Sequence, residues 1–189
     1  MKFSQDWFSH NIPNFEFCMS VLQNKQDFLE IGCFEGRASV WMLYNGLADN
    51  GSLVCIDTFK GSEEHVNLNL NNLYETFTSN VREASKPDQF VRVMKATSYE
   101  GMATLIHEKS QFDFIYIDGS HTAPDVMTDA CMAFGLLRKG GIMLFDDYLW
   151  ADVPGLLHRP KLAVDLFVTL FNEQTELLML GYQLAVRKI

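Results

Sequence analysis

The chain has 189 residues, of which 48% are hydrophobic and 21% charged, proportions that are typical of a single globular domain. Its 15 basic and 24 acidic residues give a formal net charge of −9, which argues against nucleic acid or an anionic membrane surface as a partner. No apolar run reaches the roughly 20 residues of a membrane span, and the first 15 residues lack the apolar core of a signal peptide. We therefore expect a cytoplasmic protein that does not bind membranes.

The four cysteines are scattered and show no metal-binding spacing. They are Cys18, Cys33, Cys55 and Cys131, and the last three lie in apolar or helix-like segments. In a reducing compartment, this distribution favours buried free thiols over disulfides.

Residues 1–26, rich in aromatic side chains, are expected to form a helical preface that packs on a sheet or over its ligand-binding edge. From residue 27, short apolar runs alternate with longer segments whose apolar residues recur at helical spacing. The predicted strands are 27–32, 51–57, 90–96, 112–119 and 142–148. The predicted helices are 36–48, 66–84, 98–108, 122–141 and 160–173, the third capped by Ser98 and the fourth closed by basic residues and glycines.

This alternation predicts an α/β fold in which helices cover both faces of a mostly parallel sheet. The last two strand-like runs, 175–180 and 183–188, are too close for a crossover helix, so we expect them to form an antiparallel hairpin. The expected organisation is a single domain, with the main unit at 27–189 after the preface.

Polar residues follow each of the five predicted parallel strands, at the sheet edge where ligands bind in such folds. In "EIGCFEG" (30–36), Gly32 and Gly36 let a ligand approach the backbone, although a plain tight turn would also explain them. Phe34 occupies the second glycine position of a dinucleotide-binding turn, and Glu30 suits an ammonium group better than a phosphate. Asp57, at the end of the second strand, suits both ribose hydroxyls, with a helix cap as the alternative.

"EIGCFEG" and "CID" (55–57) resemble the opening of class I S-adenosylmethionine-dependent methyltransferases. The stretch 112–150, with "IDG-x-H" and then "GG-x-x-x-x-DDY", resembles small-molecule O-methyltransferases related to the metal-dependent enzymes of macrolide sugars. The resemblance runs from residue 27 nearly to the end. It implies a Rossmann-like methyltransferase fold with a seven-stranded sheet, S-adenosylmethionine as cofactor, and a hydroxyl of a small molecule as acceptor.

The resemblance also implies roles for individual residues. Asp118, Asp146 and Asp147 would hold Mg²⁺ or another divalent cation, and three carboxylates on adjacent strand ends suit such an ion. His121 would be the general base, unless it caps the helix that follows, and Asp118 would also act in catalysis. The cofactor would contact Glu30, Gly32, Cys33, Phe34, Gly36, Asp57, Thr58, Thr97, Ser98 and Asp118.

For some further residues the sequence supports only weaker expectations of a role in the site. Tyr148 and Trp150 flank the predicted metal site and are candidates to shape the acceptor pocket, as are His65 and His158. A homo-oligomer, in which a partner subunit completes the pocket, is also expected. Two other function classes stay open: a nicotinamide-dependent Rossmann-fold oxidoreductase, and a protein that has kept the cofactor pocket but lost catalysis.

Overall fold

The computed structural model of the protein describes residues 1–61 and 68–189. Its seven-stranded sheet has the order β3-β2-β1-β4-β5-β7-β6. The strands are β1 (Asp27–Ile31), β2 (Ser52–Asp57), β3 (Phe90–Lys95), β4 (Phe112–Ile117), β5 (Leu137–Phe145), β6 (Thr175–Leu180) and β7 (Leu184–Lys188). The first five are parallel, and β7 pairs antiparallel with both β5 and β6. The predicted fold class and the C-terminal hairpin are therefore confirmed.

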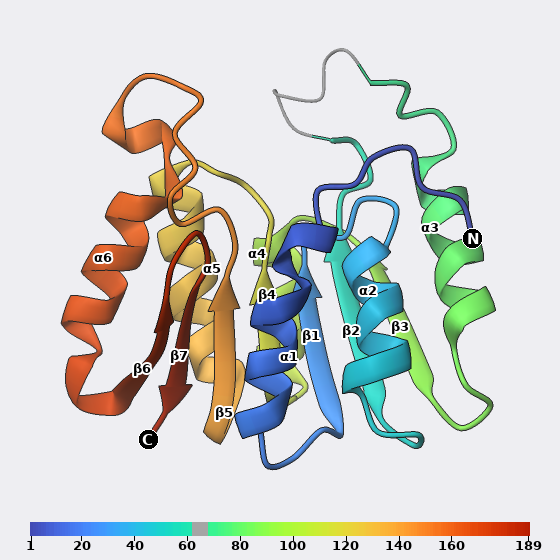
Figure 1. Ribbon diagram of the computed structural model, residues 1–189, viewed down its shortest axis with the longest axis horizontal. Helices are drawn as coiled ribbons and strands as arrows, with labels where there is room; N and C mark the ends of the chain where they lie inside the picture. The colour runs from blue at the N-terminus through green and yellow to red at the C-terminus, as the bar shows by residue number, and fades with distance from the viewer. Residues whose placement is uncertain (62–67) are drawn as a thin grey trace.

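In the described residues, six α-helices cover the two faces of this sheet (Figure 1). They are α1 (Ile12–Val21), α2 (Arg37–Trp41), α3 (Leu73–Ala84), α4 (Ser98–His107), α5 (Ala123–Leu136) and α6 (Pro160–Leu170). Helices α1 to α3 pack into one apolar core and α4 to α6 into the other, so the central strands are buried on both sides. Such strands read as continuous apolar runs, which is why the sequence marks them clearly.

Short helical segments complete the chain. The turn η1 (Ser9–Asn11) precedes α1, α2 continues as the π-helical segment η2 (Met42–Gly46), and the short helices η4 (Leu156–His158) and η5 (Asn172–Gln174) flank α6. None of the helices in the described ranges is long and apolar enough to cross a bilayer.

The N-terminal preface is helical over residues 9–21 and extended before that. Phe15 of α1 is fully buried and packs edge-on against Tyr116 of β4. The extended part crosses the carboxyl-end edge of the sheet (Figure 1), where Arg37 Nε donates to the Gln5 carbonyl at 3.1 Å. Both expected placements, on the sheet and over its ligand-binding edge, are thus present in one segment.

Two predicted helix boundaries are wrong. Helix α3 begins at Leu73, so Leu68 and Leu70 lie before it, while residues 66 and 67 fall outside the described part. Helix α5 ends at Leu136, and Arg138–Gly141 belong to β5 instead of closing the helix. Lys188 of β7 explains the early end, because its Nζ donates at 2.8 Å to the carbonyls of Phe134 and Leu137 at the helix terminus.

Two local expectations also need correction. Helix α4 is capped by Thr97, not Ser98: the Thr97 hydroxyl accepts from the Glu100 amide, and the Glu100 carboxylate accepts from the Thr97 amide. The described thiols are all free, as expected, but Cys131 is exposed on α5 while Cys18, Cys33 and Cys55 are buried.

Gly32 is the tightest point of the fold near the ligand edge, and substituting it should be costly. A Cβ there would lie 1.9 Å from the Asp118 carbonyl oxygen, and the φ of +80° disfavours any side chain. We expect Gly32→Ala to lower the free energy of unfolding, measured in urea, by more than about 2 kcal/mol.

Gly135→Ala is the matched control for this prediction. Gly135 lies in α5, and a Cβ added to it would have no atom within 4 Å, so alanine there should raise stability by roughly 0.5–1 kcal/mol. Equal effects of the two substitutions would contradict the close approach of Gly32 to Asp118.

Candidate active site

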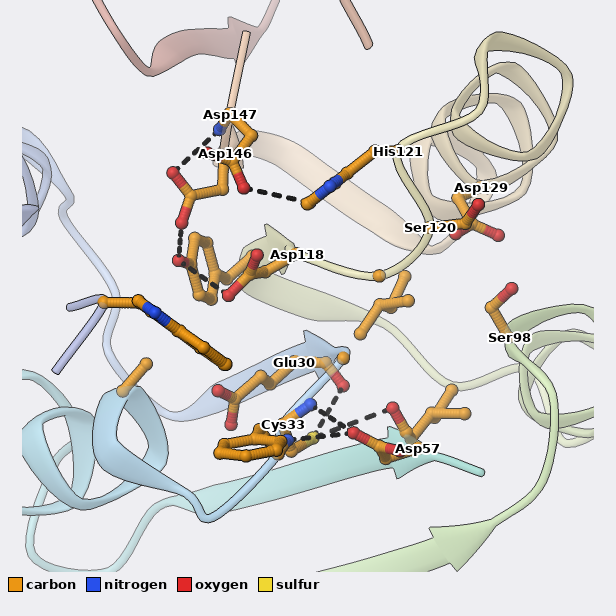
Figure 2. Close-up of a pocket in the computed structure, with 18 of the residues that line it drawn as sticks. Glu30, Cys33, Asp57, Ser98, Asp118, Ser120, His121, Asp129, Asp146 and Asp147 are labelled. Atoms are coloured by element: carbon orange, nitrogen blue, oxygen red, sulfur yellow. Dashed lines mark hydrogen bonds and ion pairs between the residues drawn. The ribbon is translucent and has the colours of Figure 1, made fainter. Parts of the chain in front are cut away.

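A cavity of about 1020 Å³ opens over the carboxyl ends of the parallel strands. Figure 2 shows its two walls: Glu30, Cys33 and Asp57 lie on one side, and Asp118, His121, Asp146 and Asp147 on the other. The cofactor and metal residues expected from the sequence line this one cavity, with the exception of Gly36, where a Cβ would meet Phe77 instead. The N-terminal segment also lines it, through Phe3, Gln5, Trp7, Phe8 and His10.

The glycine turn after β1 is held by Asp57 from the end of β2. One carboxylate oxygen of Asp57 accepts from the amides of Cys33 at 2.7 Å and Phe34 at 2.9 Å. Its other oxygen accepts from the Phe59 amide at 2.6 Å, so Asp57 caps no helix. The turn itself needs left-handed backbone at Gly32, Phe34 and Gly36. Asp57 therefore shapes the turn; three of its roughly four lone-pair sites are used, and it lines the cavity with Thr58 beside it.

Glu30 is fully buried at the end of β1, between the turn and α2. Its carboxyl group accepts a short hydrogen bond from the Ser39 hydroxyl and a longer contact of 3.8 Å from the Cys55 thiol. Burial raises the pKa of Glu30 to about 8, against the lowering effect of Ser39. The Glu30 carboxyl group is therefore largely protonated at neutral pH. Its side chain is buried in the protein interior, next to the edge of the cavity.

The hydroxyl groups of Thr97 and Ser98, which follow β3, have different partners. The Thr97 hydroxyl forms the α4 cap, whereas the Ser98 side chain points toward Asp129 of α5 (Figure 2). Both line the cavity on the face opposite α2. Of the two candidates, Ser98 has the side chain better placed to meet a ligand.

The acidic wall, which is the side of the cavity opposite Glu30 and Asp57, contains a compact group made of Asp118, His121 and Asp147. Ligand atoms of these three side chains lie within 4.8 Å of one another. His121 Nε2 is 2.9 Å from Asp147 Oδ2, and Asp147 Oδ1 accepts from the Tyr182 hydroxyl at 2.7 Å. The sequence predicted Asp146 as the third carboxylate of this group, with His121 outside it.

The Asp146 side chain points away from this group, and its carboxylate already accepts hydrogen bonds from the surrounding structure. Its carboxylate accepts from Gln183 Nε2 at 2.9 Å, from the Asp147 amide at 2.8 Å and, in a short bond, from the Tyr116 hydroxyl. Asn11 Nδ2, in the N-terminal preface, lies 3.2 and 3.3 Å from its two oxygens. Asp146 thus fastens the preface and the turn before β7 to the site.

Tyr116 joins the two halves of the acidic wall. Its hydroxyl contacts Asp118 Oδ2 at 3.1 Å as well as Asp146, yet it has one proton to donate. Burial and the charges of Asp146 and Asp147 raise the pKa of Asp118 well above its ordinary value. The wall therefore carries more negative charge than its hydrogen bonds neutralise, and it favours a proton or a cation.

His121 does not cap the helix that follows it, because the Thr122 side chain accepts from the Asp125 amide at the α5 N-terminus. The imidazole ring packs against Trp150 with a centroid distance of 4.6 Å. Trp150 lines the cavity, as expected, whereas Tyr148 turns away to donate to Asp165 at 2.8 Å.

The other histidines also differ in whether they line the cavity. His10 lines the cavity and packs edge-on against Tyr182, while His65 lies outside the described residues and His158 is not among the cavity-lining side chains. The contributions of His10, Asn11, Tyr116, Asp129, Tyr182 and Gln183 were not anticipated from the sequence. Tyr116 and Asp129 carry a retrospective signal: Tyr116 places a hydroxyl within a run of buried residues, and Asp129 falls at helical spacing among the buried residues of α5.

The donor set fits a divalent cation. The carboxylates of Asp118 and Asp147 supply hard oxygen ligands, which suit Mg²⁺ or Mn²⁺ with retained waters, and the His121 imidazole lies beside them. The surplus negative charge around Asp118 supports this fit independently of the family resemblance. A second group of potential ligands, formed by Glu30, Cys33 and Cys55, is buried and already hydrogen-bonded within itself.

Comparisons with known proteins agree with this geometry. Residues 29–148, more than half of the chain, match a family model described as a methyltransferase domain. The chain therefore belongs to this methyltransferase family, and the predicted resemblance to class I methyltransferases is confirmed.

A curated relative, the uncharacterized protein R132 of Acanthamoeba polyphaga mimivirus, is 30% identical over 125 residues, or 64% of this chain. Those residues are 51% of R132, so the chain spans about half the length of the curated relative that it matches.

Solved methyltransferases share the fold. An O-methyltransferase from Bacillus cereus in complex with SAH has a TM-score of 0.68 at 21% identity, covering 98% of this chain and 84% of that one. TomG, an O-methyltransferase from Streptomyces achromogenes involved in tomaymycin synthesis and in complex with SAM, gives 0.65 at 20% identity, with coverage of 96% and 81%. MycE, from the mycinamycin biosynthetic pathway and in complex with Mg and SAH, gives 0.61 at 17% identity, with coverage of 97% and 51%.

The raised pKa of Glu30 predicts a specific pH dependence of stability. Between its ordinary value of 4.5 and about 8, the folded state holds a proton that the unfolded state releases, so stability falls as the pH rises through this window. We expect Glu30→Gln, which stays neutral, to gain stability relative to the wild type by on the order of a few kcal/mol from pH 5 to pH 8. Urea unfolding at both pH values measures this difference.

The comparison between the two proteins cancels the other titrating groups, which both share. A gap that stays constant from pH 5 to pH 8 would contradict a protonated Glu30 in the folded state.

Proposed function

We propose that this protein transfers the methyl group of S-adenosylmethionine to an oxygen of a small molecule, with assistance from a divalent cation. The observation that carries the proposal is the convergence, in one cavity of a methyltransferase-family chain, of the glycine turn, Asp57 and the group Asp118–His121–Asp147. The SAM, SAH and Mg present in structures of similar fold support the same cofactor and cation.

The charge of the cavity narrows the choice of ligand. Its acidic lining residues, apart from Glu30, which is largely protonated at neutral pH, are Glu35, Asp57, Asp118, Asp125, Asp129, Asp146, Asp147 and Asp152. Arg37 is the one lysine or arginine among the described lining residues, and it already pairs with Asp6. Such a cavity attracts the sulfonium and ammonium groups of the cofactor and disfavours a pyrophosphate. The same field favours a neutral or cationic acceptor over a carboxylate or phosphate ester.

The cofactor would lie along the wall made by the ends of β1 and β2. Backbone of the turn around Gly32–Gly36 would receive the methionyl end, and Asp57 would accept from a ribose hydroxyl with its remaining lone-pair site. Because the Asp57 carboxylate also fixes the Cys33 and Phe34 amides, it couples the shape of the turn to the nucleoside.

The acceptor would lie on the opposite wall, among Trp150, Tyr182 and the aromatic N-terminal segment. His121 would be the general base: with its Nε2–H donated to Asp147, the basic nitrogen is Nδ1, and Asp147 stabilises the imidazolium that forms. As the acceptor oxygen bonds to the methyl carbon, the sulfur–methyl bond breaks and its electron pair stays on sulfur, while the proton goes to His121. Positioning two reactants in line would supply much of the acceleration.

Asp118 and Asp147 are the residues that would hold the cation, with Asp146 behind them as a support. A divalent cation bound there would lower the pKa of an acceptor hydroxyl and so ease its deprotonation.

Cofactor binding is the first test of this function. Isothermal titration with S-adenosylhomocysteine should give a saturable signal, and Asp57→Asn should weaken binding by about 10-fold or more, since hydrogen bonds to a charged group contribute about 1.5–3 kcal/mol. Asp152→Asn, which removes an exposed carboxylate from the same cavity, should change the affinity far less. Heat on adding NAD⁺ and none on adding S-adenosylhomocysteine would instead favour an oxidoreductase.

Metal binding separates the roles of the acidic side chains and of His121. Titration with Mn²⁺, followed by electron paramagnetic resonance, should show a site that Asp118→Asn and Asp147→Asn each weaken by about 10-fold or more. His121→Ala should leave the affinity within about twofold, because a base is not a ligand, and Asp146→Asn should have an intermediate effect.

Two results would revise this assignment. Loss of Mn²⁺ binding in His121→Ala would make the imidazole a ligand and remove it as the base. A protein that binds S-adenosylhomocysteine but no Mn²⁺ would keep the methyltransferase function without the cation.

A further inference from the structure

A second group of metal-ligand side chains lies on the wall made by the ends of β1 and β2, opposite Asp118 and Asp147. Glu30, Cys33 and Cys55 each offer one ligand atom, and these three atoms lie within 4.8 Å of one another. The function proposed above uses the backbone of the glycine turn but neither thiol. Two thiols and a carboxyl group that converge in this way are a donor set that transition-metal ions bind.

The fold brings the three side chains together from separate parts of the chain. Glu30 of β1 and Cys55 of β2 are paired in the parallel ladder, so their side chains project from the same face of the sheet. Cys33 returns to this face through the left-handed turn at Gly32, and its amide is fixed by Asp57 at 2.7 Å. Backbone pairing therefore sets the positions of the donors.

The spacing of the donor atoms is close to what a small tetrahedral ion requires. Cys55 Sγ lies 3.8 Å from Glu30 Oε2, and Cys33 Sγ lies within 4.8 Å of both atoms. Zn–S distances of about 2.3 Å and Zn–O distances of about 2.0–2.2 Å place two ligand atoms of one ion roughly 3.5–3.8 Å apart. Small side-chain adjustments are enough to close the three donors around one ion.

The three groups share protons that a metal ion would displace. The Cys55 thiol donates toward Glu30, which also accepts from the Ser39 hydroxyl. Burial raises the pKa of Glu30 to about 8 and raises the pKa of both thiols. Exchange of these protons for a cation turns neutral acids into anionic ligands, and the low dielectric of the buried surroundings strengthens their attraction for the ion.

The group can be reached from the cavity although its members are buried. Glu30 and Cys33 both line the cavity, so a water molecule there would supply the fourth ligand of a tetrahedral ion. Thiolates select borderline or soft ions such as Zn²⁺, whereas the carboxylates of Asp118 and Asp147 suit Mg²⁺ or Mn²⁺. The two facing walls in Figure 2 thus differ in the ions that they favour.

We propose that Glu30, Cys33 and Cys55 form a binding site for a thiophilic cation of the zinc class, separate from the Asp118–Asp147 site. Each of the three ligands loses its proton to solvent as the ion binds, and no electron is transferred. The inference does not rest on the proposed function, because it requires neither S-adenosylmethionine nor an acceptor.

A purely structural role for the two thiols predicts a different outcome. Buried cysteines commonly pack as small apolar residues, as Cys18 does in the same core. In that case the wall would hold no thiophilic ion, and substitution of Cys33 or Cys55 would affect stability alone. Direct metal binding separates the two roles.

The experiment titrates the full chain with Cd²⁺, a spectroscopic substitute for Zn²⁺, in excess Mg²⁺, and follows the ultraviolet thiolate-to-cadmium charge-transfer absorption. We expect saturation at one ion per chain and loss of the band when Zn²⁺ competes. Cys33→Ser and Cys55→Ser should each weaken binding by about 100-fold or more, since even outer-shell substitutions at metal sites cost about 10–100-fold.

Cys18→Ser is the matched control, because it removes an equally buried thiol from the same core, and Cys131→Ser removes the exposed one. Both variants should keep the band and the affinity of the wild type. Proton release tests the site without any substitution: isothermal titration with Cd²⁺ in two buffers of different ionisation enthalpy should give about two to three protons per ion.

Three results would each overturn the inference. One is the absence of a charge-transfer band in the wild type, and another is a band that survives in both Cys33→Ser and Cys55→Ser. The third is a band that disappears in Cys131→Ser, which would place the ion on the surface of α5.

Discussion

The common level at which β1, β4 and β5 end is the constraint on which the rest of the site depends. The ladder continues one residue past each strand: the Asp118 amide donates to the Ile31 carbonyl at 2.8 Å, and the Asp146 amide donates to the Ile117 carbonyl at 2.9 Å. These bonds hold the first residue after each strand in line with its neighbours. Gly32 must be a glycine because the Asp118 backbone passes directly over it. Backbone pairing, not attraction between the side chains, therefore assembles the acidic wall.

Assembling like charges in this way has an electrostatic cost that burial increases. Asp118 and Asp146 both have raised pKa values, with burial as the main cause in each. Glu30 responds to the same conditions by holding its proton. The fold tolerates this concentration of acids because its cores are continuous on both faces of the sheet. A cationic cofactor and a divalent cation would relieve the charge at the two ends of the cavity, which links the stability of the chain to its proposed ligands.

The sequence reveals the sheet and the location of the site, because buried parallel strands and the polar residues after them are local signals. Features set by contacts between distant residues are not visible in it. The end of α5 depends on Lys188, some 50 positions later, and the orientation of Asp146 depends on Asn11 and Gln183 at opposite ends of the chain. Thr97 and Ser98 are adjacent and both carry a hydroxyl group, so the sequence does not determine which of them caps α4. The choice depends on a difference of one residue in where the helix begins.

Asp146 and Asp147 show how far adjacent identical residues can differ. Asp146 still follows the strand, so its side chain points to the face covered by α1 and meets Asn11, Tyr116 and Gln183. Asp147 has left the strand with a φ of +52°, and this left-handed turn swings its carboxylate to His121. Aspartate tolerates that conformation better than most residues do. The first aspartate therefore holds the N-terminal segment over the cavity, and the second is presented to His121. Two neighbouring carboxylates are needed because one cannot face both sides of the sheet.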